Sequence, residues 1–305
     1  MAQPPLPLYQ KLGQYIVNLF LRALILFALA LPYATRVRLM GWLVSRIVAP
    51  LAGYDKRVRA NLAHVLPDLP EAEIKRLCRA VPDNAGRTLI EIYSGAEFVE
   101  RAKRAPISGP GLAALEDARD KGQAVILVTG HFGNYDVSRA NLIARGHNMG
   151  ALYRPMRNRY FNVHYVRSIS TIGTPMFEQG RRGMMQMVRH IRQGGVLGIL
   201  TDLNALDGVP LDYFGKPALT SLITAELALK YNALLLPVYS IRAQNGLDFE
   251  IIVQAPIAHS DPKTMTQQVN DGLESLVRDH LEQWFWIHRR WKYGTIDPKT
   301  LNKKK

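Results

Sequence analysis

Cysteine is almost absent from this chain, because Cys78 is the one thiol in 305 residues. A single cysteine excludes an intramolecular disulfide and a zinc site built on cysteine ligands, so we interpret Cys78 as a core or interface residue. Several catalytic signatures are missing too. There is no Gly-x-Ser-x-Gly elbow, Walker loop, Gly-x-Gly-x-x-Gly turn or His-Glu-x-x-His helix. The sequence therefore gives no support to a serine hydrolase, a nucleotide-binding enzyme of these types or a zinc peptidase.

Acidic residues are also scarce, since 25 aspartates and glutamates stand against 39 lysines and arginines. The formal net charge of +14 at pH 7 predicts an anionic partner, which could be a membrane surface, an acidic substrate or carrier protein, or nucleic acid. Hydrophobic residues make up 48% of the chain, which is enough for a full core. The length fits one large α/β domain or two smaller ones.

The N-terminal region contains a long apolar stretch, from Tyr15 to Pro32, that is interrupted by Asn18 and Arg22. As a helix it would reach roughly 27 Å, just short of a hydrocarbon core of about 30 Å. Asn18 and Arg22 lie four residues apart on one helix face, so we predict a polar stripe in the first half and a fully apolar second half. Such a helix spans the bilayer or lies in one leaflet. A buried core helix is the alternative.

A second stretch, Leu39 to Gly53, combines apolar residues with arginines and suits the membrane interface. We therefore predict that residues 1–54 form membrane-anchoring or interfacial helices and that residues 55–305 form an α/β domain. The basic residues follow the apolar segment, and only Lys11 precedes it. If the segment spans the membrane, the positive-inside rule places the main domain in the cytoplasm.

From about residue 106 onward, short apolar runs alternate with helix-like stretches. The runs are 124–128, 150–153, 196–200, 234–241 and 249–253, and the helix-like stretches are 136–144, 161–172, 182–192 and 221–231. This alternation predicts an α/β fold with a largely parallel sheet flanked by helices. Three helical stretches (57–65, 71–78 and 85–92) precede the sheet, and a last long helix from Thr264 to about Trp286 closes the domain.

Polar side chains follow three of the predicted strands where open parallel sheets place their sites, at the carboxyl ends. His131 lies just past the first run, Arg154 ends the next and Asp202 ends another, while Asp136 begins the helix after His131. Each has an ordinary interpretation: a surface histidine, an acid at a helix N-terminus, or a structural Arg154–Asp202 ion pair. Their coincidence at one edge of the sheet predicts an active site.

The His131–Asp136 spacing suits a general base. Five residues along one helix turn a side chain by roughly 140°, so the two groups meet only if His131 lies on the turn before the helix. Gly130 and Gly133 give that turn its backbone freedom. A carboxylate on one imidazole nitrogen lets the other accept a proton from a hydroxyl, and backbone N–H groups at the helix start suit an oxyanion. The residues indicate acyl transfer to a hydroxyl; whether Asp136 or Asp202 orients His131 stays open.

The segment His131-Phe132-Gly133-Asn134-Tyr135-Asp136 resembles the His-x-x-x-x-Asp/Glu motif of glycerolipid and lipid A acyltransferases. Over nearly its whole length the chain resembles the lipid A late (lauroyl/myristoyl) acyltransferase family, which includes phosphatidylinositol mannoside acyltransferases. Further segments carry this resemblance: 61–63, 66–67, 86–91, 153–155, 195–202, 213–218, 236–239 and, most specifically, the tryptophan-rich segment 282–292.

The resemblance implies a bacterial inner-membrane O-acyltransferase whose catalytic domain lies on the cytoplasmic side. It would move a fatty acyl chain from an acyl-ACP (acyl carrier protein) or acyl-CoA thioester to a hydroxyl of a membrane lipid. Its partners would be the acyl carrier protein, the acceptor lipid and the anionic membrane surface, with no metal and no cofactor besides the acyl thioester as cosubstrate. It also implies that His131 is the base and Asp136 its partner, and that the substrate-binding residues are Arg154, Asp202, Gly133 and Asn134.

Some positions depart from the family pattern and bear on the acceptor. Many relatives follow the Asp202 position with Gln and Asp, where this chain has Leu203 and Asn204, and they often carry a basic residue in place of Glu226. Fewer basic groups favour a less phosphorylated acceptor. A lyso-aminolipid with a 3-hydroxyacyl amide therefore stands beside the 3-hydroxyacyl chain of a lipid A precursor.

Two other functions are alternatives. A lysophospholipid (glycerolipid) acyltransferase is disfavoured because the segment Phe-Pro-Glu-Gly-Thr-Arg-Ser that is usual there is absent. A non-catalytic membrane-surface or nucleic-acid-binding protein is more remote, since the basic residues are spread along the chain without a recognisable module. We interpret Trp284, Trp286 and Trp291 as membrane or packing residues rather than a base-stacking platform.

Overall fold

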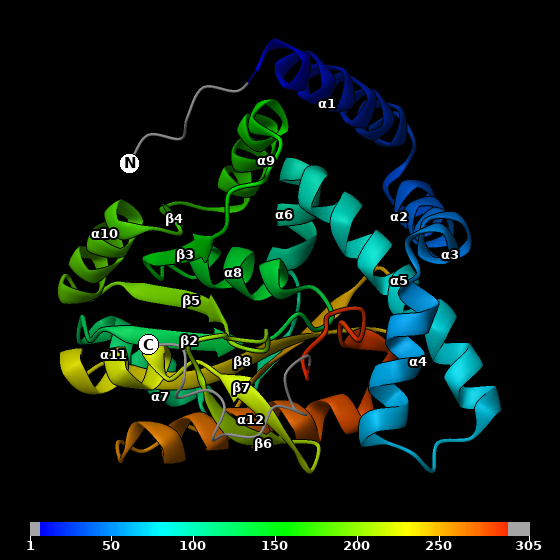
Figure 1. The fold of residues 1–305 in the computed structure, drawn as a ribbon. Coiled ribbons are helices and arrows are strands. Elements are labelled where there is room, and N and C mark those ends of the chain that lie inside the picture. The colour runs from blue at the N-terminus through cyan, green and yellow to red at the C-terminus, as the bar shows by residue number, and fades with distance from the viewer. Residues whose placement is uncertain (1–6, 292–305) are drawn as a thin grey trace.

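Seven strands form the central sheet of the computed structural model, which describes residues 7–291 (Figure 1). Their order across the sheet is β1-β9-β8-β2-β5-β3-β4, and all neighbours run parallel except β8 and β9. This confirms the predicted α/β fold with a largely parallel sheet. The strands are β1 (Ile107–Ser108), β2 (Val125–Thr129), β3 (Met149–Tyr153), β4 (Met176–Glu178), β5 (Val196–Leu200), β8 (Leu234–Arg242) and β9 (Phe249–Val253).

Helices cover both faces of the sheet, which is why its central strands read as continuous apolar runs. Alternate residues of β2 enter different cores, because successive side chains of a strand point to opposite faces. Leu127 joins the core made with α5, α6, α7, α8 and α9, and Ile126 joins the core made with α10, α11 and α12. The helices are α5 (Glu71–Tyr93), α6 (Gly95–Lys103), α7 (Leu112–Asp120), α8 (Tyr135–Ala144), α9 (Arg159–Ile172), α10 (Arg181–Arg192), α11 (Ile223–Tyr231) and α12 (Pro262–Asp279).

The N-terminal part is a series of helices, and the first of them, α1, carries the predicted polar stripe. The Gln14 side chain accepts a hydrogen bond from the backbone N–H of Arg159 (3.0 Å), and the Gln14 carbonyl accepts one from the Asn158 side chain (2.7 Å). Asn18, one turn further on, is buried. The polar stripe thus faces α9. The helical segments are α1 (Leu8–Leu29), α2 (Tyr33–Leu43), a π-helical turn (Val44–Val48), α3 (Ala49–Ala52) and α4 (Tyr54–Val65).

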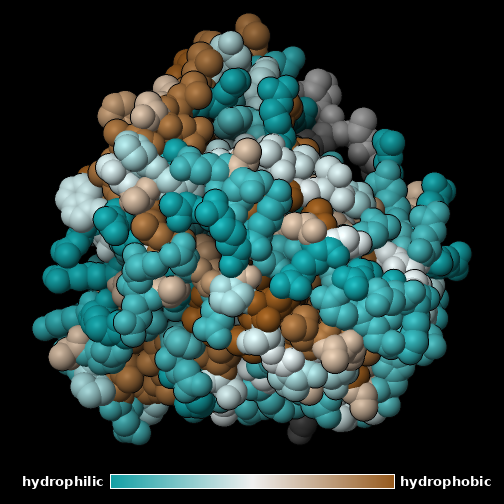
Figure 2. Space-filling view, turned by 180° about the vertical axis from the view of Figure 1, so that it is seen from behind, coloured by the Kyte–Doolittle hydropathy of each residue, from teal (hydrophilic) through white to brown (hydrophobic). Residues whose placement is uncertain are grey.

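The rest of the α1 surface is apolar and uncovered, as the brown band along the top of Figure 2 shows. Phe20 is 62% and Phe27 is 68% exposed. Within residues 7–291, α1 is the one helix long and apolar enough to cross a membrane, and its exposure argues against the alternative of a buried core helix. Ile25 and Ala28 nevertheless join the core that also contains sheet residues, so the end of α1 is anchored on the α/β body.

The prediction of two separate helical stretches, 71–78 and 85–92, was wrong, because residues 71–93 form the single helix α5. Pro82 lies inside it. Proline in a helix interior costs about 3 kcal/mol, but Leu77, Val81 and Ile90 on either side of it are almost fully buried. Packing of these turns against the rest of the protein outweighs the local preference of proline.

The last helix was predicted to reach about Trp286, but α12 ends at Asp279. Leu281–Gln283 form one 3-10 turn, and Trp284 has extended backbone and pairs with Phe132 in an isolated antiparallel bridge. This tertiary pairing ends the helix. The C-terminal segment then packs in a core with α4 and a separate antiparallel hairpin, β6 (Val209–Tyr213) and β7 (Lys216–Thr220). Lys292, the last residue of the tryptophan-rich segment, lies outside the described residues.

From the exposed apolar face of α1 we predict that Phe20 and Phe27 contact lipid and do not contribute to the stability of the fold. The double variant Phe20→Glu/Phe27→Glu should lose binding to phosphatidylglycerol vesicles in cosedimentation, since each charge costs about 2.5–3.5 kcal/mol in hydrocarbon. Its thermal unfolding midpoint in detergent should stay at the wild-type value. The control, Gln123→Glu/Gln193→Glu, adds the same charge at exposed positions elsewhere. Undiminished vesicle binding by the α1 variant would contradict this expectation.

Candidate active site

His131 lies in the short loop between β2 and α8, and the C-terminal segment holds that loop in place. The Phe285 backbone N–H donates to the His131 carbonyl (3.0 Å), and the Gly133 N–H donates to the Gln283 carbonyl (3.0 Å). Gly133 has φ of +52°, and a Cβ there would lie 1.9 Å from the Ser240 carbonyl oxygen. Glycine is therefore required, both for the left-handed backbone and for the close approach of β8.

The carboxylate that contacts His131 is that of Asp202, which follows the neighbouring strand β5. Asp202 Oδ1 lies 2.8 Å from His131 Nδ1, and Oδ2 accepts the His131 backbone N–H at 2.7 Å. The indole N–H of Trp284 donates to the same Oδ2 at 2.9 Å. The Asp202 side chain is 2% exposed and that of His131 is 26% exposed. The imidazole thus stands between a buried anion and open space.

Asp202 is charged in this setting despite its burial. Burial alone would raise the pKa of its carboxyl, but attraction to His131 and the hydrogen bonds from His131 and Trp284 outweigh it and hold the pKa below its usual value. Nearby, burial lowers the pKa of His288, whose Nε2 accepts the backbone N–H of Asn204 at 3.0 Å. At this edge of the sheet, His131 and Asp202 thus form a hydrogen-bonded histidine–carboxylate pair.

Asp136 occupies the first turn of α8, as predicted, but its carboxylate points to another partner. Oδ1 lies 2.8 Å from Nε and 2.7 Å from Nη2 of Arg139, one turn along the same helix. Arg139 also donates to the carbonyls of Ile169 and Gly173 at the end of α9. The interpretation of Asp136 as the residue that orients His131 does not fit this geometry, because Asp202 fills that position. Asp136 does line the cavity beside His131.

A cavity of about 1000 Å³ opens at the carboxyl edge of the sheet, beside His131. Its polar lining includes His131, Asp136, Arg139 and Arg154, so the structure brings Arg154 to the predicted site. The apolar part of its lining reaches between the sheet and the helices α8 and α9; it includes Leu127, Met149, Ile169, Met176 and Val238. The lining of the cavity thus combines charged and apolar side chains, as a site for an amphiphile requires.

Gly133 and Asn134, predicted to bind substrate, lie behind the cavity rather than in its lining. Asn134 is fully buried. Its side-chain oxygen caps α8 by accepting the Asp136 N–H (3.1 Å), and its amide donates to Glu91 on α5 (2.8 Å). The two residues shape the turn that carries His131, and none of the Asn134 surface is exposed in this structure.

A buried ion pair supports this turn from below, and sequence reasoning missed it. Arg242 at the end of β8 makes two hydrogen bonds to Glu91 (2.6 and 2.8 Å) and one to Thr88 (3.1 Å). Thr88 in turn donates to the Gly133 carbonyl (2.9 Å). A signal was present in the sequence, because Glu91 interrupts the apolar run Leu89-Ile90-Glu91-Ile92. A charge in that place needs a buried partner.

The three C-terminal tryptophans are packing residues. Trp284 and Trp286 are at most 1% exposed, and Trp291 is 8% exposed. Their rings contact one another and those of Tyr213 and Phe214. They are therefore not available as a platform for nucleic-acid bases, and Trp284 reaches the site through its bond to Asp202.

Comparison with known proteins decides the family. A profile described as bacterial lipid A biosynthesis acyltransferase matches residues 5–293. This chain belongs to that family. It is 24% identical over 270 residues to a lipid A biosynthesis acyltransferase of Haemophilus influenzae, covering 84% of this chain and 81% of the relative. It is 23% identical over 272 residues to the lipid A biosynthesis lauroyltransferase of Escherichia coli K12 (86% and 87%). It is also 22% identical over 245 residues to a phosphatidylinositol mannoside acyltransferase of Mycobacterium tuberculosis (78% of each).

The protein is therefore an acyltransferase, and an acyltransferase of this family has a lipid as its acceptor. Positions that depart from the family pattern, Asn204 and Glu226, lie in the lining of the cavity beside Leu203. Within the described part of the lining the carboxylates are those of Asp136, Asp207 and Glu226. The two exposed ones, Asp207 and Glu226, place negative charge in the lining of the cavity.

The close approach at Gly133 can be tested by stability. Gly133→Ala should lower the free energy of unfolding by about 1–2 kcal/mol for the left-handed backbone and by about 1–3 kcal/mol more for the collision with the Ser240 carbonyl. Gly146→Ala is the matched control, because Gly146 also has positive φ (+88°) but no atom lies within 4 Å of a Cβ placed there. Urea unfolding in detergent measures both. Equal losses in the two variants would show that the approach of β8 does not require glycine.

Proposed function

We propose that this acyltransferase moves a fatty acyl chain from a thioester donor, acyl-ACP or acyl-CoA, to a hydroxyl of a membrane-lipid acceptor, with His131 as the general base. The observation that supports it is the hydrogen bond between His131 Nδ1 and the buried, charged Asp202 beside the cavity. A carboxylate on Nδ1 fixes the tautomer in which Nε2 has a free lone pair, and it stabilises the imidazolium that forms.

In this mechanism Nε2 takes the proton of the acceptor hydroxyl as its oxygen adds to the thioester carbonyl. The tetrahedral intermediate then collapses, the C–S bond breaks, and the leaving thiolate recovers the proton from the imidazolium. The products are an ester and a free thiol, and His131 is neutral again. No protein nucleophile and no metal or other cofactor takes part.

The oxyanion of that intermediate needs a donor, and the α8 start is less suited than the sequence suggested. The Gly133 and Asp136 N–H groups already donate to Gln283 and Asn134. Arg154 lines the same cavity and is exposed, and no ion pair joins it to another of the described residues. We therefore assign it to the developing negative charge, which a nearby cation stabilises electrostatically.

The acceptor is, in our proposal, a 3-hydroxyacyl chain of either a lipid A precursor or a lyso-aminolipid. Asp207 and Glu226 disfavour an acceptor with several phosphates, because like charges repel at the cavity mouth. The apolar interior suits a fatty acyl chain. The exposed face of α1 supports a location at the bacterial inner membrane, and the positive-inside rule favours the cytoplasmic side for the catalytic domain.

A direct assay tests the function. Purified enzyme is given radiolabelled acyl-ACP or acyl-CoA with either a lipid A precursor or a lyso-aminolipid, and products are separated and identified by mass spectrometry. We expect ester formation by the wild type and a loss of roughly 10²–10⁴-fold in kcat for His131→Ala, as for removal of a general base. His259→Ala, at an exposed histidine outside the cavity lining, is the control. Full activity of His131→Ala would refute the mechanism, and turnover of lipid A precursors alone would refute the aminolipid.

The two carboxylates should respond differently to conversion to amides. Asp202→Asn should lower kcat by roughly 10²–10⁴-fold, because Nδ1 loses its anionic partner. Asp136→Asn leaves the Arg139 cation buried without a countercharge and should destabilise the fold by about 3–5 kcal/mol, with a smaller effect on kcat at a temperature where the variant is folded. Rates and thermal unfolding are measured on both. Loss of activity only in the Asp136 variant would show that Asp136, and not Asp202, orients His131.

A further inference from the structure

Helix α10 carries an unusual surface that the proposed chemistry does not use. Its twelve residues include four arginines and no acidic residue. Arg181, Arg182, Arg189 and Arg192 are all exposed. Within residues 7–291, no carboxylate lies within ion-pair distance of any of them. Most other helices of the body pair their exposed cations internally, as α6 does between Lys103 and Glu100.

A shallow apolar groove of about 370 Å³ runs between these arginines. Met184, Met185 and Val188 line it together with Arg189 and Arg192, and Met185 is 61% exposed. Residues 181, 185, 188 and 192 follow the spacing of one helix face, so cations stand at both ends of the methionine groove. Flexible methionine side chains adapt to the apolar face of a docked helix.

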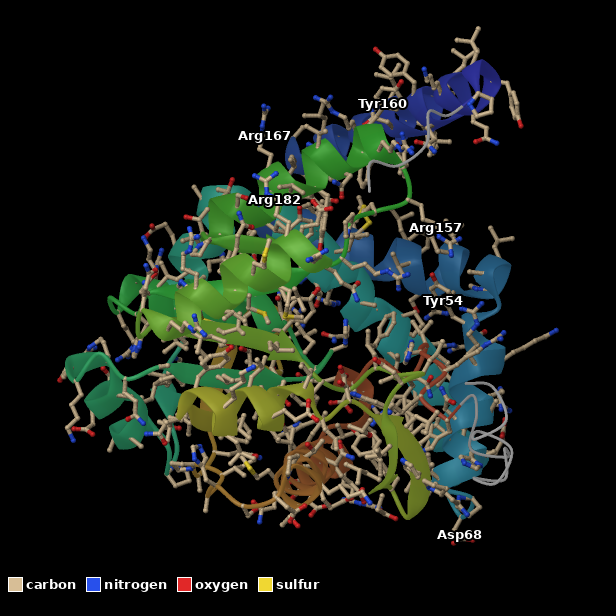
Figure 3. The ribbon with its side chains drawn as sticks, turned by 60° about the vertical axis from the view of Figure 1, so that its left-hand side comes forward. Tyr54, Asp68, Arg157, Tyr160, Arg167 and Arg182 are labelled. Atoms are coloured by element: carbon tan, nitrogen blue, oxygen red, sulfur yellow. The ribbon has the colours of Figure 1, made fainter. Side chains whose placement is uncertain are left out.

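The groove adjoins the active-site cavity at Met184. Met184 lines both, and Gln179 and Gly180, immediately before α10, also line the cavity. Figure 3 shows Arg182 at the start of α10. A partner seated on α10 therefore lies next to the opening through which its thioester has to pass.

We propose that α10 is the docking surface for an acidic, helical acyl carrier protein, which presents its thioester to the cavity. This inference rests on the proposed function and narrows its donor to a carrier protein. Four guanidinium groups without a carboxylate partner among residues 7–291 match the carboxylates of an acidic helix, and the methionine groove receives the apolar residues of that helix. Acyl-CoA offers negative charge but no helix face to fill the groove.

A lipid surface is a poorer occupant of α10. The helix packs on the core with α11 and α12, whereas α1 joins the core on the other face of the sheet (Figure 1). The large exposed apolar face belongs to α1, and α10 exposes methionines rather than the aromatic residues common in interfacial helices. The outer surface of α10 is thus left to a soluble partner.

Charge reversal tests this surface. The variant Arg182→Glu/Arg189→Glu changes two residues of α10 that do not line the cavity. The control, Arg104→Glu/Lys263→Glu, makes the same change in net charge at exposed residues of other elements. We measure the Kd for acyl-ACP by titration calorimetry, and kcat and KM with acyl-ACP and with a small acyl-pantetheine thioester. Thermal unfolding confirms that each variant is folded.

We expect the α10 variant to raise both the Kd and the KM for acyl-ACP at least tenfold, with kcat and acyl-pantetheine turnover within twofold of wild type. Wild-type affinity should also fall more steeply with salt than that of the variant. Unchanged Kd and KM would overturn the inference, as would an α10 variant that loses binding to anionic vesicles but keeps its affinity for the carrier protein. A wild type that binds acyl-ACP on α10 but transfers no acyl chain would refute the proposed function and leave the docking surface standing.

Discussion

The carboxylate of Asp202 is the contact on which the rest of the site depends. It binds the side chain and the backbone of His131, and it receives the indole N–H of Trp284. It thereby joins the ends of β2 and β5 to the C-terminal segment. Burying a carboxylate without hydrogen-bond partners is strongly unfavourable. The indole N–H of Trp284 adds a third hydrogen bond to the two from His131. Helix α12 ends at Asp279. Trp284 then pairs with Phe132, and its indole N–H lies beside Asp202.

A second buried charge supports the same loop from the opposite side. Glu91 and Arg242 neutralise each other, and Asn134 and Thr88 connect them to the turn around Gly133. Buried ion pairs contribute little net stability because their desolvation is costly, but breaking one is strongly destabilising. The pair fixes α5, β8 and the loop relative to one another. This arrangement holds the imidazole in one orientation, and a general base needs such constraint in order to work.

Much of the sheet and one end of the site could be predicted from the sequence. The five main strands were predicted from largely apolar runs, and His131, Arg154 and Asp202 were expected at the same edge. The choice between the two carboxylates could not be made, because it depends on which strands are neighbours. In the structure Thr129 pairs with Leu200, so residues two positions beyond each strand, His131 and Asp202, stand opposite. Strand order is set by the packing of helices on both faces, which local patterns do not encode. For the same reason the end of α12 and the continuity of α5 through Pro82 escaped prediction.

The carboxylates of Asp202 and Asp136 bind different partners, so the histidine and the aspartate of the His-x-x-x-x-Asp motif do not contact each other. Since Asp202 binds the His131 side chain, Asp136 is free to bind Arg139, which reaches the carbonyls of Ile169 and Gly173 at the end of α9. The beginning of α9 in turn binds Gln14 on α1. A continuous set of contacts therefore runs from the histidine loop through α8 and α9 to the helix with the exposed apolar face. The site is fixed relative to that face. In the proposed function, an acceptor held in the lipid therefore meets His131 at a defined position, and the donor docks on α10, in the helical layer on the opposite face of the sheet.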